Sequence, residues 1–240
     1  MNTMPSPAQL AGIYNDAYDG ATTSYFAKAD AKMRRSRHRV RQLRRHVDGG
    51  RLLDIGCNGG FMVEAARTHG FEAHGVELDP VSVAYARKHY PANAYFHGTV
   101  QEFAESGGAE RPFDAVYCSE VIEHVPDSWS FVAAIASLMR PGAVLYITTP
   151  NISHWRRPKD LTKWDAFCPP AHCVYFNPAN LPRLLAAHDL DVFKRFVAWK
   201  PGVKLLARKS YASNPSRTSP KTATASLRIA GAASGGTTSI

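Results

Sequence analysis

Five short β-rich runs alternate with helical segments between Arg51 and Thr149. They are RLLDIG, FEAHGVEL, NAYFHG, FDAVYCSE and AVLYITT. Strands that alternate with helices are typical of a parallel sheet wound with helices on both faces. Two later runs, DVFKRFVAW and VKLLARKS, have the pattern of an antiparallel pair that closes such a sheet. The sequence therefore predicts an α/β fold: a doubly wound, mostly parallel seven-stranded sheet with an antiparallel closing strand, in three α/β/α layers.

Capping residues and apolar stripes place helices between and beside these strands. Pro80 suits the first turn of PVSVAYARKHY, because a missing N–H is no loss there. Asp127 or Ser128 can cap a later helix, which Pro141–Gly142 is expected to end. Helical apolar spacing marks one helix before this core and one after it, at Val40, Leu43 and Val47 and at Leu181, Leu184 and Leu185. Right-handed crossovers then bring the loops that follow the parallel strands to one edge of the sheet.

The formal charge of +9 is confined to two parts of the 240-residue chain. Residues 28–51 hold ten Lys or Arg against two Asp, and residues 200–240 hold seven against no acid. Basicity is therefore a property of a helix face and a tail, and not of the predicted core. We expect N-terminal helices over 1–50, one domain over 51–210, and a disordered basic tail over 211–240, which has no apolar period.

The apolar runs, the first residues and the cysteines indicate the compartment in which the protein is expected. No apolar run reaches the roughly 20 residues that cross a bilayer, and the first residues lack the pattern of a signal peptide. The four cysteines are scattered, which indicates reduced thiols rather than a disulfide framework. These features predict a cytoplasmic protein with no membrane span, and they leave monomer and homodimer equally open.

A glycine-rich turn follows the first predicted strand. It runs from Asp54 through Ile-Gly-Cys-Asn-Gly to Gly60 and exposes backbone N–H groups to a ligand. Asp54 would repel a pyrophosphate but suits the amino and sulfonium groups of S-adenosylmethionine. Glu77 ends the second strand, 21 residues after Gly56, where a carboxylate can accept hydrogen bonds from both hydroxyls of an adenosine ribose. The spacing is not G-x-G-x-x-G, because position 58 is Asn, a residue that tolerates a positive φ.

Four segments in order resemble the motifs of class I S-adenosylmethionine-dependent methyltransferases: LLDIGCNGG, GVELDP, FDAVYCSEVIEHVPD and LMRPGAVLYITTPN. The chain is most similar to the small-molecule branch that includes ubiquinone-pathway O-methyltransferases, over about residues 14–209. The resemblance implies a Rossmann-like fold, a lid insertion at about 151–177, and S-adenosylmethionine as the cofactor. It also implies a small-molecule methyl acceptor, with an oxygen of a phenol or hydroxyl as the methylated atom.

The same resemblance assigns residues to the cofactor. The methionine half would be lined by Asp54, Gly56, Cys57, Asn58 and Gly60. The adenosine half would be held by Glu77 on the ribose, by Leu78 on the adenine face, and by Thr99 and Val100 near the adenine amino group. Cys118 and Ser119 would lie close to the transferred methyl group. Aromatic residues would cover the two sides of the site, at Tyr14, Tyr18, Tyr25 and Phe26 and at Trp155, Trp164, Phe167, Tyr175 and Phe176.

Candidates for chemistry at the acceptor follow the fourth strand as E-x-x-E-H, at Glu120, Glu123 and His124. In a helical turn the i, i+3 and i+4 spacing would put all three on one side. They would then form a site for a divalent cation such as Mg²⁺, which some members of the resembled branch use. Without a metal, His124 would be the catalytic base, oriented by Glu120 or Glu123, and a capped turn with no chemical role is the third interpretation. His172 is the second catalytic candidate, or a residue that fixes its own loop by hydrogen bonds.

Other functions stay open at this level. A nucleic-acid methyltransferase could use the basic helix and tail, although CSEVIEH replaces the Asn-Pro-Pro-aromatic element that grips a base, and this disfavours nucleic acid. A nicotinamide-dependent oxidoreductase is disfavoured by the glycine spacing and Asp54. A noncatalytic cofactor-binding protein would keep the same fold. A zinc site at Cys168, His172 and Cys173 is disfavoured because a fourth ligand and a C-x-x-C pair are both missing.

Overall fold

The computed structural model describes residues 26–211, in which seven strands form one sheet in the order β3-β2-β1-β4-β5-β7-β6. The strands are β1 (Gly50–Ile55), β2 (Phe71–Glu77), β3 (Ala94–His97), β4 (Phe113–Ser119), β5 (Met139–Pro150), β6 (Leu190–Arg195) and β7 (Gly202–Lys209). Strand β7 pairs antiparallel with both β5 and β6, and the pairs among β1 to β5 are parallel. The predicted doubly wound sheet with an antiparallel closing strand is confirmed.

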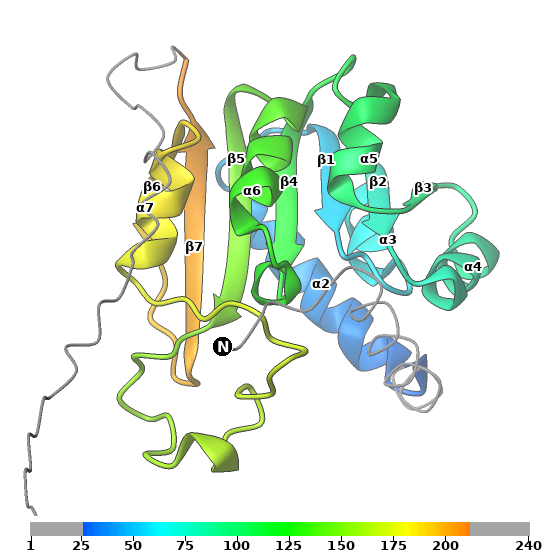
Figure 1. Ribbon diagram of the computed structural model, residues 1–240. Coiled ribbons are helices and arrows are strands. Elements are labelled where there is room, and N and C mark those ends of the chain that lie inside the picture. Colours follow the sequence, from blue (N-terminus) through cyan, green and yellow to red (C-terminus); the bar gives the residue numbers. More distant parts are fainter. Residues whose placement is uncertain (1–25, 212–240) are drawn as a thin grey trace, which may run out of the picture.

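Helices cover both faces of the sheet and complete three layers (Figure 1). They are α2 (Ala29–Leu43), α3 (Phe61–Arg67), α4 (Pro80–His89), α5 (Val100–Phe103), α6 (Ser128–Leu138) and α7 (Asn180–Ala186), with short turns at η1 (Ala104–Gly108), η2 (Ile122–His124) and η3 (Leu161–Lys163). Alternate strand residues face opposite cores, so that Leu52 packs with α2 and α3 while Leu53 packs with α6 and α7. None of the helices described between residues 26 and 211 is long and apolar enough to cross a membrane.

Local sequence signals explain most helix boundaries. Asp79 caps α4 through the N–H groups of Val81 and Ser82, and Asp127 caps α6 through the N–H of Ser130. The end of α6 differs from the expectation, because the helix stops at Leu138 and β5 begins at the next residue. Pro141–Gly142 lies inside the start of β5, where an irregular register against β4 accommodates the extra residues.

The arginine-rich helix α2 is amphipathic as expected. Val40 and Leu43 are fully buried against the sheet, and Val47 after the helix is nearly so. Six arginines in this helix or just after it are exposed: Arg34, Arg35, Arg37, Arg41, Arg44 and Arg45. The predicted aromatic cover at Tyr14, Tyr18 and Tyr25, and the predicted tail beyond Tyr211, lie outside the described residues.

The carboxyl edge of the parallel strands gathers the segments that matter for function. The chain leaves β5 at Pro150, and the segment 151–177 then returns to the end of β4. The carbonyl oxygen of Glu123 accepts hydrogen bonds from the N–H groups of Cys173 and Val174, at 2.8 and 3.1 Å. The turn η2 and the segment 151–177 are therefore held together beside the loop that follows β1.

Candidate functional site

The turn between β1 and α3 needs residues that adopt a positive φ. Gly56 has φ +72°, and a Cβ there would meet Cγ2 of Val121 at 2.4 Å, so only glycine fits. Gly60 has φ +77° and closes the turn before α3. Asn58 has φ 46°, the left-handed region that asparagine tolerates. The departure from G-x-G-x-x-G thus keeps the tight turn and leaves Gly56 exposed at the sheet edge.

Glu77 holds this turn from the end of β2. Its Oε2 accepts a hydrogen bond from the N–H of Asn58 at 2.7 Å, and its Oε1 accepts from the N–H groups of Leu78 and Asp79 at 2.8 and 2.9 Å. A carboxylate offers about four acceptor positions. One acceptor position, on Oε2, therefore remains for a ligand hydroxyl. The sequence had led us to expect that Glu77 accepts hydrogen bonds from both ribose hydroxyls. Burial raises the pKa of Glu77, and the three N–H donors oppose that rise.

Asp54 lies at the end of β1 and is 3% exposed. Burial, and then the nearby charge of Glu77, raise the pKa of Asp54 well above its usual value, while Arg39 lowers it. The ionised carboxylate is therefore costly in the protein alone. A cationic ligand beside it would reduce that cost, which is the property expected of a sulfonium site.

Arg39 of α2 is a residue that the sequence analysis missed. Its guanidinium donates a hydrogen bond to the hydroxyl of Tyr117 and lies close enough to Asp54 to affect its pKa. A signal was present, because Arg39 falls on the helix face of Ser36 and Leu43, which are buried. Arg39 thus brings a positive charge to the methionine end of the predicted cofactor site.

Asp54→Asn is expected to raise the melting temperature of the ligand-free protein at pH 7 and to lower affinity for S-adenosylmethionine about 10-fold. The raised folded pKa means that the charged form of Asp54 destabilises the fold above its unfolded pKa, so the gain should vanish near pH 4. S-Adenosylhomocysteine lacks the sulfonium charge and should lose less affinity. Thermal melts and calorimetry check this, and an equal loss for both ligands would contradict the charge argument.

The adenine side of the edge is formed by residues after β2 and β3. Leu78 is 49% exposed and offers an apolar surface, as expected for an adenine contact. Thr99 caps α5 in a capping box, in which its hydroxyl bonds the N–H and the carboxylate of Glu102. The Thr99 hydroxyl is therefore already used by the protein. Val100 begins α5 with its side chain buried, and helix starts leave N–H groups for other partners.

The end of β4 carries a chain of hydrogen bonds. The hydroxyl of Ser119 donates to that of Thr148 at 2.7 Å, and Thr148 donates to Oε1 of Glu120 at 2.7 Å. Glu120 has φ 57°, a conformation that breaks the helical turn expected over residues 120–124. Cys118 points the other way and is fully buried in the core. Ser119 thus faces the edge, whereas Glu120 is directed to Thr148 on β5.

The group that the structure brings together here is Glu123, His124 and His172, each with a ligand atom within 4.8 Å of the others. Nδ1 of His124 lies 2.9 Å from the carbonyl oxygen of Ala171, and Nδ1 of His172 lies 2.8 Å from that of Ala166. A carbonyl only accepts, so both Nδ1 atoms carry a proton, and in the neutral form of each ring Nε2 carries the lone pair. The prediction that Glu120 joins Glu123 and His124 is corrected: His172 takes that place.

This donor set does not fit Mg²⁺. Two imidazole nitrogens and one carboxylate suit a transition metal, whereas Mg²⁺ prefers oxygen ligands. Glu123 is 1% exposed, and its Oε1 has no hydrogen-bond partner among residues 26–211. Burial, and then the charge of Glu120, raise the pKa of Glu123 to about 8. Burial, and then His172, lower the pKa of His124 to about 4, so His124 is neutral at pH 7.

Glu123→Gln is expected to stabilise the protein between pH 7 and 9 and to have little effect at pH 4. Folding raises the pKa of Glu123 from 4.5 to about 8, so the native state holds an extra proton between these values and loses stability as the pH rises. Urea unfolding of both proteins at pH 4, 7 and 9 measures the difference. A gain that is equal at all three values would show that packing, and not the proton, is responsible.

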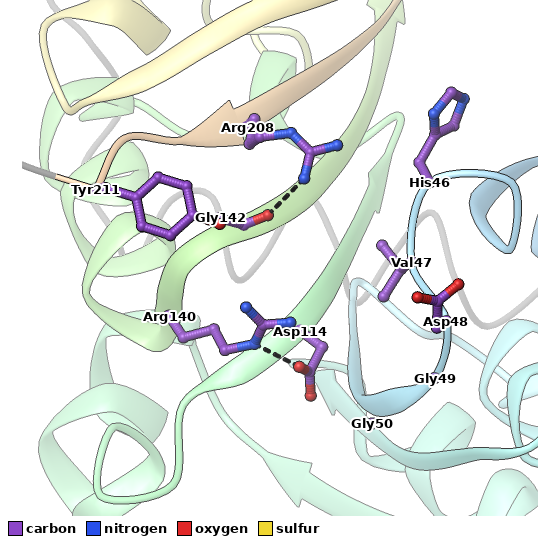
Figure 2. Close-up of a pocket in the computed structure, with 10 residues that line it drawn as sticks. All are labelled: His46, Val47, Asp48, Gly49, Gly50, Asp114, Arg140, Gly142, Arg208 and Tyr211. Carbon is purple, nitrogen blue, oxygen red and sulfur yellow. Dashed lines mark hydrogen bonds and ion pairs between the residues drawn. The ribbon is translucent and has the colours of Figure 1, made fainter.

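A separate pocket lies at the opposite, amino edge of the sheet, beside the start of β1 (Figure 2). Its two sheet arginines are already engaged, because Arg140 is paired with Asp114 and Arg208 donates to the carbonyl of Gly142 at 2.9 Å. The carboxylates and imidazoles described above are all at the carboxyl edge. We therefore place the candidate site there.

Comparison with known proteins decides the family. A family model described as "Methyltransferase domain" matches residues 25–194. The chain belongs to this methyltransferase family. The matched residues of the methyltransferase domain include α2, the glycine-rich turn, η2 and His172, but not β7.

Relatives of the methyltransferase domain match it in part. A "Ubiquinone biosynthesis O-methyltransferase" of Aromatoleum aromaticum is 40% identical over 107 residues, which make up 43% of this chain and 45% of that protein. A protein of the same name from Stutzerimonas stutzeri is 35% identical over 125 residues, 50% of this chain and 52% of that protein. The chain thus spans about half the length of the curated relatives it matches.

Solved structures agree on the fold. A 1,6-didemethyltoxoflavin-N1-methyltransferase from Burkholderia thailandensis superposes with a TM-score of 0.63 at 17% identity, covering 88% of this chain and 93% of that one. That structure holds S-adenosylhomocysteine. At this identity the likeness supports the Rossmann-like architecture of the methyltransferase domain and no choice of acceptor.

Proposed function

We propose that the protein transfers a methyl group from S-adenosylmethionine to an oxygen of a small-molecule phenol or hydroxyl. One observation carries this proposal. Two buried carboxylates suited to a cationic adenosyl ligand lie at the same edge of the sheet as a pair of imidazoles suited to accept a proton. The names of the curated relatives support oxygen as the methylated atom. A basic helix with exposed arginines does not by itself support a nucleic-acid substrate.

The residues at the edge fit the cofactor. Glu77 would accept a ribose hydroxyl at the remaining position on Oε2, and Leu78 would contact the adenine. Asp54 would oppose the positive charge of the methionine half, and Arg39 would bind its carboxylate. When bound, the cofactor would supply a sulfonium methyl group, which the acceptor oxygen attacks in line while the thioether sulfur of S-adenosylhomocysteine leaves. The protein then contributes alignment and the exclusion of water.

His124 and His172 are proposed as the proton acceptor for the hydroxyl. Their rings meet edge to face with centroids 4.5 Å apart, so a positive charge on one imidazole disfavours a positive charge on the other. Both Nδ1 atoms are fixed by carbonyl groups, which directs the basic Nε2 atoms away from these anchors. The proton would leave the acceptor oxygen for one Nε2 as the new O–C bond forms.

A divalent cation is the competing use of the same groups. A transition metal bound by Glu123, His124 and His172 would occupy the Nε2 atoms that a base requires, so the two roles exclude each other. Under our proposal, exhaustive chelation leaves turnover unchanged. Loss of turnover that Zn²⁺ or Mn²⁺ restores would instead establish the metal role.

Calorimetric titration with S-adenosylmethionine, S-adenosylhomocysteine and NAD tests the cofactor. We expect micromolar binding of both adenosyl compounds and none of NAD. Absence of adenosyl binding would contradict the proposal. Turnover is then measured with labelled methyl donor across phenols, amines and a nucleic-acid substrate. Binding without turnover on any of them would favour a noncatalytic protein.

A further inference from the structure

Lys204 of β7 has no role in the proposal above. It is directly opposite Thr148 of β5, which in turn is opposite Ser119 of β4. Side chains of directly opposed residues point to the same face of a sheet. Lys204 therefore lies on the same face as Ser119, two strands away, or roughly 10 Å at ~4.8 Å per strand. Strand β7 lies beside β5 in Figure 1, and the two pair from Gly202 to Arg208 of β7.

The ammonium group of Lys204 is half-buried among aromatic rings. Its Nζ lies 4.5 Å from the ring centroid of Phe196 and 5.3 Å from that of Tyr146. Tyr146 in turn stacks on Tyr117 with centroids 4.9 Å apart. Cation–π contacts of this kind hold an ammonium in place but leave its charge uncompensated. Within the part of the chain that the structure describes, Lys204 forms no ion pair.

A second positive charge adds to this imbalance. Burial and the positive charge of Arg39 both lower the pKa of Lys204. Arg39 has Asp54 within electrostatic reach, so its charge is partly compensated. Among residues 26–211, no acidic residue acts on Lys204 in the same way. A half-buried cation at the edge of a binding site, with a second cation near it, is best stabilised by an anion that arrives with a ligand.

We propose that Lys204 binds an anionic substituent of the methyl acceptor. The acceptor class is then an aromatic hydroxy acid, whose carboxylate binds at Lys204, in preference to a neutral phenol. Phe196 beside the ammonium provides an apolar surface for the ring of such an acid. This inference rests on the methyltransferase function proposed above and specifies its acceptor.

The test measures binding of small acids to the complex of the protein with S-adenosylhomocysteine. The probes are 3- and 4-hydroxybenzoate and the corresponding hydroxybenzamides, which keep the shape and remove the charge. In the wild type the acids should bind about 10-fold more tightly than the amides. Lys204→Met should abolish this difference, and Lys204→Arg should keep it. Lys194→Met is the matched control, because Lys194 of β6 lies 5.3 Å from the same Phe196 ring and is expected to have no effect.

Each other result overturns the inference. Acids that bind no better than amides, including no binding of either, would show that the site has no anion preference. A preference that survives Lys204→Met would place the anion elsewhere. Weaker binding of S-adenosylhomocysteine to Lys204→Met would assign the lysine to the methionine carboxylate. Failure of the wild type to bind S-adenosylhomocysteine at all would instead contradict the proposed function, so the two failures are distinguishable.

Discussion

Glu77→Ala is expected to lower affinity for S-adenosylmethionine and S-adenosylhomocysteine by about 100-fold or more. The variant removes the ribose acceptor and also the carboxylate that bonds the N–H groups of Asn58, Leu78 and Asp79. Hydrogen bonds to a charged group contribute about 1.5–3 kcal/mol each, and 1.4 kcal/mol corresponds to a factor of ten in affinity. Calorimetry with both ligands measures the loss.

Glu72→Ala is the matched control for Glu77→Ala. Glu72 lies on the same strand but pairs with Arg51 and Arg111 on the surface, so its removal should leave affinity unchanged. Circular dichroism confirms that each variant is folded before its affinity is measured. Near-normal binding by folded Glu77→Ala would show that the ribose assignment is wrong, whatever the other residues do.

His172→Ala is expected to reduce kcat by about 10²–10⁴-fold and to leave affinity for S-adenosylhomocysteine unchanged. The loss should shrink for acidic phenols such as nitrophenols, because these are already ionised at neutral pH and need no base. His124→Ala should give a similar loss, and the double variant should be little worse than either, since groups that act as a unit are not additive. Single-turnover rates over a series of phenols measure the effect.

His69→Ala is the matched control for the imidazole pair. Nδ1 of His69 also bonds a backbone carbonyl, that of Ala65 at 2.8 Å, but it lies at the end of α3. Its replacement should leave kcat unchanged. If His172→Ala lost equal activity with acidic and ordinary phenols, the residue would be a positioning residue for the segment 151–177 and not a proton acceptor.

Local signals in the sequence were sufficient for the sheet and for the cofactor turn. These signals are the period-two runs, the caps Asp79 and Asp127, and the glycines at positive φ. Each acts over a few residues, so the element it forms can be predicted without knowledge of tertiary contacts. The fold prediction is confirmed, and the residues placed on the cofactor meet at one edge. Their roles toward it remain predictions.

The arrangement of residues after β4 could not be predicted from local signals. The E-x-x-E-H spacing indicates a shared helix face only if a helix forms, and Glu120 takes a left-handed conformation because its N–H and side chain both bond Thr148. His172 reaches His124 through contacts between segments 47 residues apart, which no local pattern encodes. Lys204 was missed for the same reason, because its importance lies in what faces it across the sheet. Arg39 differs, since its place on the buried face of α2 was a local signal.

The attachment of the segment 151–177 has a consequence for how such enzymes diversify. Two main-chain N–H groups bond one main-chain carbonyl, that of Glu123, so the anchorage depends on backbone shape and not on side-chain identity. Mutations can therefore exchange the side chains of this segment over evolutionary time without detaching it. A lineage of this architecture can change the compound it modifies while the half proposed to bind the adenosyl ligand stays constant.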